Sequence, residues 1–182
     1  MATNAVEMNV VVRLEIVQLP TLYVIGKSIR YSHEALDNGD NRLPAFWDQC
    51  NKELLFAPLE SQTDNIYLDS YAGVFLDWDL GDSDFTYFVG MLMKEGAIVP
   101  FGYSVRELAA TEAAWLWVKA KALAETRAVP FESAEKAIKE LGRDFAGMKW
   151  CIDLYDRARS TTLDENGRVI LDCFIPLDRT RQ

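Results

Sequence analysis

The chain has 182 residues, of which 49% are hydrophobic and 26% charged, a balance typical of a globular protein that needs no disulfide or metal to hold its core. Its formal net charge of −9 argues against direct binding to nucleic acid, because DNA affinity depends largely on basic side chains that neutralise phosphates. No apolar run approaches the roughly 18 residues of a membrane span, and the N-terminus lacks the pattern of a signal peptide, so we expect a cytoplasmic protein without a membrane partner.

The first half of the chain is predicted to form a β-α-β-β unit. Apolar and polar residues alternate from Met8 to Ile16, which indicates a half-buried strand, and a second β-rich piece follows at residues 22–26. Apolar residues at helical spacing after Pro44 predict a helix. The expected elements then are a helix at residues 44–56 and strands at residues 66–76 and 85–93, joined by an Asp-rich loop at residues 77–84.

The second half repeats this order. A strand is expected at residues 103–119, a helix at 132–145, and two further strands at 149–155 and 168–177, with the turn signal Asn166-Gly167 before the last of them. Asp69-Ser70-Tyr71 and Asp153-Leu154-Tyr155 share an Asp-x-Tyr core at corresponding places. We therefore predict a single α+β domain over residues 1–182, made of pseudo-repeats at about 8–95 and 103–177, with an antiparallel sheet and a ligand cleft between the halves.

An acidic residue followed two positions later by an aromatic one occurs in both final strands, at Asp153–Tyr155 and Asp172–Phe174. Residues two apart on a strand share a face, so we expect these four side chains to gather on one surface of a final hairpin. The other, helix-covered side would carry Ile152, Leu154, Leu171 and Ile175. A carboxylate among aromatic rings suits an organic cation. The alternative is a solvated sheet face, with Tyr155 packing across from the two acids.

Several tryptophans are candidates for a binding wall or for the core. Trp115 and Trp117 share a face if their segment is a strand, and either role explains them, because the segment is apolar on both faces. Trp47 on the first helix is expected to be a core or interface anchor. The loop around Trp78 lacks the spacing and the closing Glu of a calcium loop, so no metal is expected there.

The motifs of conventional catalysis are missing, since the chain has no Gly-rich phosphate loop, GxGxxG, HExxH or GxSxG pattern. We accordingly expect no catalytic residue, cofactor or metal. His33 is the one histidine, and Cys50, Cys151 and Cys173 lack the paired spacing of a zinc site. Strand parity predicts that Cys151 and Cys173 point to opposite faces and form no disulfide.

Four short motifs follow one another in a recognisable order: residues 85–90 (FTYFVG), 100–102 (PFG), 105–110 (VRELAA) and 172–177 (DCFIPL). Together they resemble the gyrase-inhibitor-like (GyrI-like) effector-binding domains, which occur fused to AraC- and MerR-type regulators and as free-standing proteins, including integron-cassette drug-binding modules. Residues 19–26 and 43–47 are similar to the opening strand and first helix of that family. The resemblance covers nearly the whole chain.

The resemblance implies a tandem β-α-β-β fold whose pocket, between the pseudo-repeats, takes lipophilic and often cationic compounds. It places the pocket acid at Asp153, before Leu154-Tyr155, and the last-strand acid and aromatic residue at Asp172 and Phe174. The chain departs from the family in having Asp for Glu at both places, no Gly after residues 113–119, and a long loop between Tyr155 and Asp172. No helix-turn-helix fits before Met8, so we expect a free-standing copy.

The preferred interpretation is a non-enzymatic module that senses or sequesters a lipophilic organic cation, with a separately encoded regulator as a further candidate partner. The expected ligand-binding residues are Asp153, Tyr155, Asp172, Phe174, Trp115, Trp117, Tyr87 and Phe75. Asp153 is expected to lie deeper than Asp172. One alternative is a hydrolase of strained electrophilic rings, in which Asp153 activates water. Another is an acidic interaction module that engages a topoisomerase or a regulator.

Overall fold

The computed structural model describes residues 11–32, 34–35, 38–77, 84–121, 131–145 and 150–178. His33 and the part of the Asp-rich loop that contains Trp78 lie outside these residues. The strands are β1 (Val11–Leu19), β2 (Leu22–Ser32), β3 (Ile66–Leu76), β4 (Asp84–Met93), β5 (Ser104–Leu108), β6 (Thr111–Lys121), β7 (Trp150–Asp156) and β8 (Arg168–Pro176). The helices are α2 (Leu43–Lys52), α3 (Ala57–Glu60) and α4 (Phe131–Glu140), with a short 3-10 turn, η1, at Thr63–Asn65.

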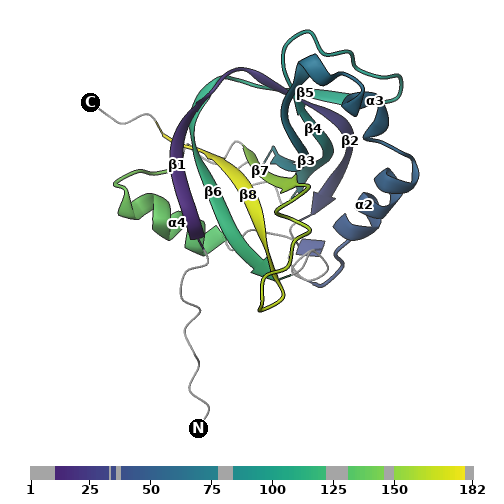
Figure 1. The fold of residues 1–182 in the computed structure, drawn as a ribbon. Helices are drawn as coiled ribbons and strands as arrows, with labels where there is room; N and C mark the ends of the chain where they lie inside the picture. The colour runs from purple at the N-terminus through teal and green to yellow at the C-terminus, as the bar shows by residue number, and fades with distance from the viewer. Residues whose placement is uncertain are drawn as a thin grey trace.

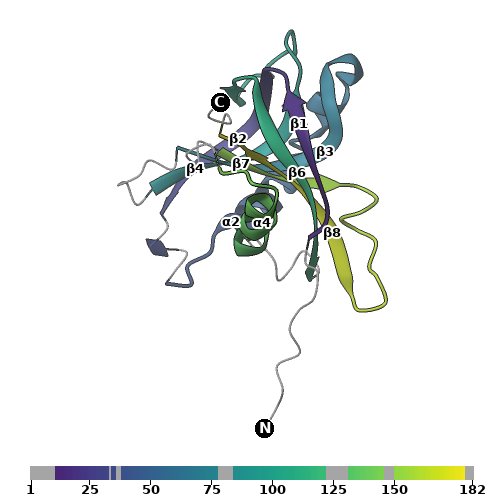
Figure 2. The ribbon, with the colours of Figure 1, turned by 90° about the vertical axis from the view of Figure 1, so that its left-hand side faces the viewer.

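The strands form one curled antiparallel sheet in the order β1-β6-β8-β7-β3-β4-β2-β5 (Figure 1). Helices α2 and α4 lie on the same side of this sheet, as the second view shows (Figure 2). The predicted α+β architecture with an antiparallel sheet is thereby confirmed. No helix in the described part of the chain has the length and apolar character needed to cross a bilayer.

The sheet order is symmetric about the β7–β3 pair, and each half contributes its first strand to the other half. Strand β1 pairs with β6 and β5 pairs with β2, so the halves are joined at both edges as well as at the centre. The strand expected at residues 103–119 is in fact two strands, β5 and β6, separated by Ala109 and Ala110. The equivalent tyrosines of the two Asp-x-Tyr motifs, Tyr71 and Tyr155, are direct partners across β3 and β7.

The predicted helices end earlier than their apolar patterns suggested. Helix α2 ends at Lys52, and Leu54 then adopts a left-handed φ of 54° before the separate helix α3 begins at Ala57. Helix α4 ends at Glu140, and Gly142 follows with a φ of 69°, a conformation that favours glycine and commonly terminates helices. Helix α2 carries Trp47, whose ring meets that of Tyr155 on the central strand β7.

The two faces of the sheet have different coverings. A large hydrophobic cluster on one face contains residues of both halves together with α2, α3 and α4, including Leu43, Leu59 and Ile138. The cluster on the other face consists of strand residues alone, including Val74, Ile152 and Phe174. We call these the helix face and the helix-free face.

Candidate functional site

The pairing register divides the eight predicted ligand-binding residues equally between the two faces. Asp153 lies opposite Cys173, and Asp172 lies opposite Leu154. Directly opposed residues of antiparallel strands share a face, so Asp153 and Asp172 point to opposite sides of the sheet. The helix face carries Asp153, Tyr155, Phe75 and Tyr87, and the helix-free face carries Asp172, Phe174, Trp115 and Trp117.

The expectation that Asp153, Tyr155, Asp172 and Phe174 gather on one surface is therefore wrong. Side chains alternate along each strand as expected, but β7 and β8 pair one residue out of the register that would put Asp153 and Asp172 on the same face. A shift of one residue in pairing moves every side chain of a strand to the other face, and the sequence pattern of the two strands does not set this parity. Ile152 and Leu154 accordingly belong to the helix-free face rather than the helix-covered one.

On the helix face, Asp153 lies among aromatic side chains from four elements. Tyr155 follows it on β7, Phe75 and Tyr87 come from β3 and β4, and Trp47 comes from α2. The rings of Trp47 and Tyr155 meet edge to face with centroids 4.8 Å apart, and those of Phe75 and Tyr87 meet similarly at 4.7 Å. We call these five residues the acid–aromatic cluster.

A glycine makes room for the centre of this cluster. Gly73 is the direct partner of Asp153 across β3 and β7, and a Cβ atom at Gly73 would lie 2.4 Å from the Tyr87 hydroxyl oxygen. The Tyr87 hydroxyl therefore occupies the space above Gly73, beside Asp153, where it accepts a hydrogen bond of 2.9 Å from Trp47 Nε1. Burial raises the pKa of Tyr87 and the nearby Asp153 raises it further, although hydrogen bonds with Trp47 and Tyr155 oppose this rise.

Asp153 is a buried carboxyl group without a compensating partner among the residues that the structure describes. Its exposed fraction is 3%, and none of the described residues forms a hydrogen bond or an ion pair with its side chain. Burial alone raises the pKa of Asp153 from 3.8 to about 7. A carboxylate desolvated in this way gains more from a cationic partner than an exposed one does.

Asp172 is also buried, with an exposed fraction of 1%, so the expectation that it is the wetter acid is wrong. Unlike Asp153, it is neutralised by Arg159, whose Nε and Nη2 donate to the two carboxylate oxygens at 3.0 and 2.7 Å. Trp115 Nε1 donates a further hydrogen bond of 3.1 Å. Burial raises the pKa of Asp172, whereas the Arg159 guanidinium lowers it.

The tryptophans of the helix-free face also have partners within the protein. The guanidinium carbons of Arg159 and Arg13 lie 4.6 and 4.4 Å from the centroid of the Trp117 ring. Trp115 packs against Phe174 with centroids 5.6 Å apart. The low exposure of Asp153 and Asp172 contradicts the alternative of a solvated sheet face, and the Arg159 ion pair gives Asp172 a structural explanation.

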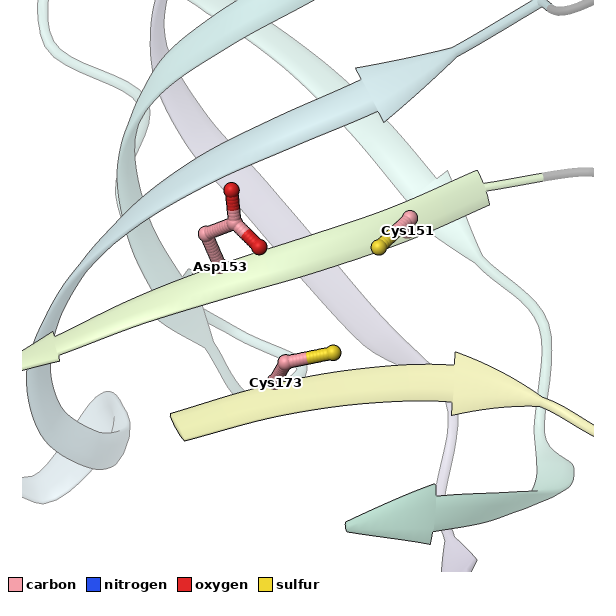
Figure 3. Close-up of side chains that lie close together, drawn as sticks. All are labelled: Cys151, Asp153 and Cys173. Atoms are coloured by element: carbon pink, nitrogen blue, oxygen red, sulfur yellow. The ribbon is translucent and has the colours of Figure 1, made fainter. Parts of the chain in front are cut away.

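Cys151 and Cys173 lie on the same face, contrary to the parity prediction. Figure 3 shows Cys151 and Asp153 on β7 and Cys173 on the neighbouring β8, with both thiols near the carboxylate. Both cysteines are buried and unbridged. The error has the same cause as the misplacement of Asp172. The register pairs Cys173 directly with Asp153, and Cys151 shares the face of Asp153 because it lies two residues away on the same strand, so both cysteines are on the helix face.

Three residues that surround the two buried acids were not predicted in these roles from the sequence. Trp47 was expected only as an anchor, and its helical spacing after Pro44 was the available signal. Gly73, in the middle of an apolar strand, was a signal for close approach of another group. Arg159 lies in the long segment between β7 and β8, and nothing in its sequence neighbourhood pointed to Asp172.

Solved structures of known proteins share this fold, although their sequences are distant. The structure of SAV2435 bound to tetraphenylphosphonium superposes with a TM-score of 0.61 at 16% identity, covering 91% of this chain and 94% of that one. A Staphylococcus aureus protein described as a transcription regulator gives 0.59 at 17%, over 92% and 99%. The Vibrio cholerae integron cassette protein VCH_CASS2 gives 0.51 at 8%, over 92% and 97%.

No protein-family model matches the sequence, and no curated protein matches it significantly. The similarity to solved structures extends over almost the whole length of both chains in each comparison, so it concerns the complete fold. These neighbours fit the GyrI-like resemblance that the motifs indicated, and they share the fold of this chain.

Proposed function

We propose that this protein binds a lipophilic organic cation at the acid–aromatic cluster, with Asp153 as the counter-charge. The observation that carries the proposal is the carboxyl group of Asp153, which is 3% exposed, surrounded by aromatic rings and unpaired among the described residues. Aromatic faces attract cations through their quadrupole, and a desolvated carboxylate adds a direct charge interaction. The neighbouring SAV2435 structure, which contains tetraphenylphosphonium, supports this class of ligand.

The packing of the rings indicates how a ligand would enter. Trp47 and Tyr155 are in edge contact, so a tetraphenyl cation would have to separate them to approach Asp153. Trp47 is carried by α2, whereas Tyr155 belongs to the central strand β7. We therefore place the movable wall of the site on α2 and its fixed floor on the sheet. Asp172, Phe174, Trp115 and Trp117 are not part of the proposed site, because they lie on the helix-free face.

Two ions of equal size and opposite charge test the proposal. Tetraphenylphosphonium and tetraphenylborate present nearly the same apolar surface, so isothermal titration of both separates charge recognition from hydrophobic binding. We expect the cation to bind and the anion to bind at least tenfold more weakly at pH 8. Equal affinities for the two ions would contradict the role of Asp153.

Variants locate the effect within the chain. Asp153→Asn keeps the volume and removes the charge, so it should weaken phosphonium binding by about 1.5–3 kcal/mol, the range of charge-assisted contacts. Asp172→Asn should cost about 1 kcal/mol or less, because Asp172 faces away and is neutralised by Arg159. Asp69→Asn is the matched control in the equivalent Asp-x-Tyr motif, with a side chain 75% exposed, and should have no effect. A larger loss of affinity in Asp172→Asn than in Asp153→Asn would place the binding site on the helix-free face and contradict the proposal.

A second candidate function, hydrolysis of strained electrophilic rings, is favoured by one observation. The pKa of Asp153, about 7, is in the range in which a general base is effective near neutral pH. Incubation with a cyclopropane-containing electrophile, followed by mass spectrometry, distinguishes the two functions. Ring-opened product formed over many turnovers and lost in Asp153→Asn would support catalysis, whereas recovery of intact substrate would leave binding as the function.

A further inference from the structure

Two buried thiols lie beside the Asp153 carboxyl group. The Cys151 and Cys173 sulfur atoms and a carboxylate oxygen of Asp153 all lie within 4.8 Å of one another (Figure 3). All three side chains are buried. Cys151 and Asp153 are two residues apart on β7, and Cys173 is directly opposite Asp153 on β8, so the strand pairing itself holds the three groups in a triangle.

The composition of the triangle calls for an explanation beyond packing. Buried cysteines are common as small apolar side chains, and a pair of thiols alone would be ordinary core. A carboxyl group within 4.8 Å of them, buried without a hydrogen-bond partner among the described residues, is costly unless it binds something. Sulfur and carboxylate oxygen together are the donor atoms that zinc accepts in proteins.

We propose that Cys151, Cys173 and Asp153 form a binding site for a single thiophilic divalent metal ion of the Zn²⁺ type. In a tetrahedral site with Zn–S bonds of about 2.3 Å, two sulfurs are roughly 3.8 Å apart. The observed separations, 4.8 Å or less, need to contract by no more than about an ångström. The three protein ligands leave a fourth position for water or another small ligand.

Binding converts both thiols to thiolates, and their two protons pass to solvent. A hydrogen bond with Cys151 and burial raise the pKa of Cys173 well above its usual value, so a metal ion has to displace the proton of this thiol. With Asp153 ionised, two thiolates and one carboxylate around a divalent ion leave a net charge of −1. The net charge is therefore the same as that of ionised Asp153 with two neutral thiols, and the change on binding is that the buried carboxylate gains a directly bound cation.

The metal site is independent of the proposed function but shares Asp153 with it. A carboxylate that is bound to a metal cannot also act as the counter-charge for an organic cation. Zn²⁺ and tetraphenylphosphonium should therefore compete, each weakening the binding of the other. The cysteines belong only to the metal site, so their variants separate the two proposals.

Cobalt serves as the spectroscopic probe for the metal site. The full chain, with its thiols shown to be reduced by a colorimetric thiol titration, is titrated anaerobically with Co²⁺. We expect one Co²⁺ per chain, a thiolate-to-cobalt charge-transfer band, the visible bands of a tetrahedral ion, and loss of both on addition of Zn²⁺. Reduced protein that shows no charge-transfer band would overturn the proposal.

Variants assign the ligands. Cys151→Ser and Cys173→Ser should each weaken Co²⁺ binding by at least roughly tenfold, since the loss of even an outer-shell partner commonly has that effect. Cys50→Ser is the matched control, because Cys50 is the third buried cysteine of the chain and lies on α2, outside the triangle. The cobalt spectrum of this variant should equal that of the parent protein. Full-strength bands in either ligand variant, or their loss in the Cys50 variant, would contradict the assignment. Alanine replacements with the same readout serve if a serine variant does not fold.

Ligand binding to the same variants keeps the two proposals apart. Both cysteine variants should retain the parental affinity for tetraphenylphosphonium, while Asp153→Asn should lose affinity for both Co²⁺ and the organic cation. Cobalt binding without phosphonium binding would support the metal site and reject the proposed function. Phosphonium binding that depends on Asp153, in a protein that shows no cobalt bands, would support the proposed function and reject the metal site.

Discussion

Asp153 and Asp172 are both buried aspartates on neighbouring central strands, yet they have opposite relations to their surroundings. Asp172 faces away from the helices and is held by Arg159 and Trp115. Asp153 faces the helices and is surrounded by rings and thiols, and no described residue supplies it with a cation. Burial therefore does not by itself identify a functional acid. The two acids differ in their internal partners, because Asp172 is paired with Arg159 whereas Asp153 has no such partner among the described residues.

The largest expected effect of replacing either acid is the effect of Asp153→Asn on the pH dependence of stability. The pKa of Asp153 is about 7 in the folded chain and 3.8 for an unperturbed group, so the folded state retains its proton to higher pH. The part of the burial cost that is linked to ionisation of Asp153 is consequently absent below about pH 4, increases as pH rises to about 7, and reaches up to about 4 kcal/mol above that. Asp153→Asn should remove this cost and raise the free energy of unfolding at pH 8.

Urea denaturation of the parent and Asp153→Asn at pH 4, 6 and 8 checks this expectation. The two should have similar stability at pH 4 and diverge toward pH 8. The exposed Asp69→Asn control should follow the parent at every pH. A constant difference between Asp153→Asn and the parent would show that the carboxyl group is not titrating within this window.

The second effect has the opposite sign. Asp172→Asn removes the bidentate partner of Arg159, so it should lower the free energy of unfolding by about 2–3 kcal/mol at pH 7. The side chain of Arg159 is 30% exposed, and water therefore compensates part of the loss. A double-mutant cycle with Arg159→Gln, measured by urea denaturation, should show a favourable coupling between the two residues. If the cycle gives no coupling, the ion pair is not what holds Asp172.

The third prediction concerns ligand affinity rather than folding. Only ionised Asp153 attracts a cation, so phosphonium affinity should rise with pH through about 7 and level off above it. Between pH 6 and pH 8 the ionised fraction increases roughly tenfold, and the apparent dissociation constant should fall by about that factor. Isothermal titration at these two pH values measures the change. Asp153→Asn should show no such dependence. If the affinity of the parent protein is independent of pH, binding does not depend on ionisation of Asp153.

The smallest effect compares one tryptophan from each face. Trp47→Phe removes the hydrogen bond to the Tyr87 hydroxyl and the largest ring of the cluster, so it should weaken phosphonium binding by about 0.5–1 kcal/mol. Trp117→Phe alters only the contacts with Arg13 and Arg159 on the helix-free face and should leave that affinity unchanged. Titrations that show a loss for Trp117→Phe and none for Trp47→Phe would reverse the assignment of the faces.

Local sequence patterns were sufficient for the type and order of most elements, although β5 and β6 were expected as one strand and α3 was not expected as a separate helix. Alternating apolar residues predicted the strands at 66–76 and 85–93, which the structure has as β3 (Ile66–Leu76) and β4 (Asp84–Met93). These features depend on side-chain periodicity and on backbone preferences within a few residues, which is information that a short segment contains. The ends of helices were less predictable, because the left-handed Leu54 that follows α2 is not a residue that favours this conformation.

The sequence singled out Asp153, through the motif Asp153-Leu154-Tyr155, but it did not predict the surroundings of this residue. Only the tertiary structure decided that Asp153 faces Cys173 and Gly73, that α2 brings Trp47 to the Tyr87 hydroxyl, and that Arg159 neutralises Asp172. The physical reason is that strand register, and with it the face of every side chain, is set by the connections and by packing across the whole sheet. A change of one residue in register exchanges the two faces while leaving the alternating pattern of each strand intact.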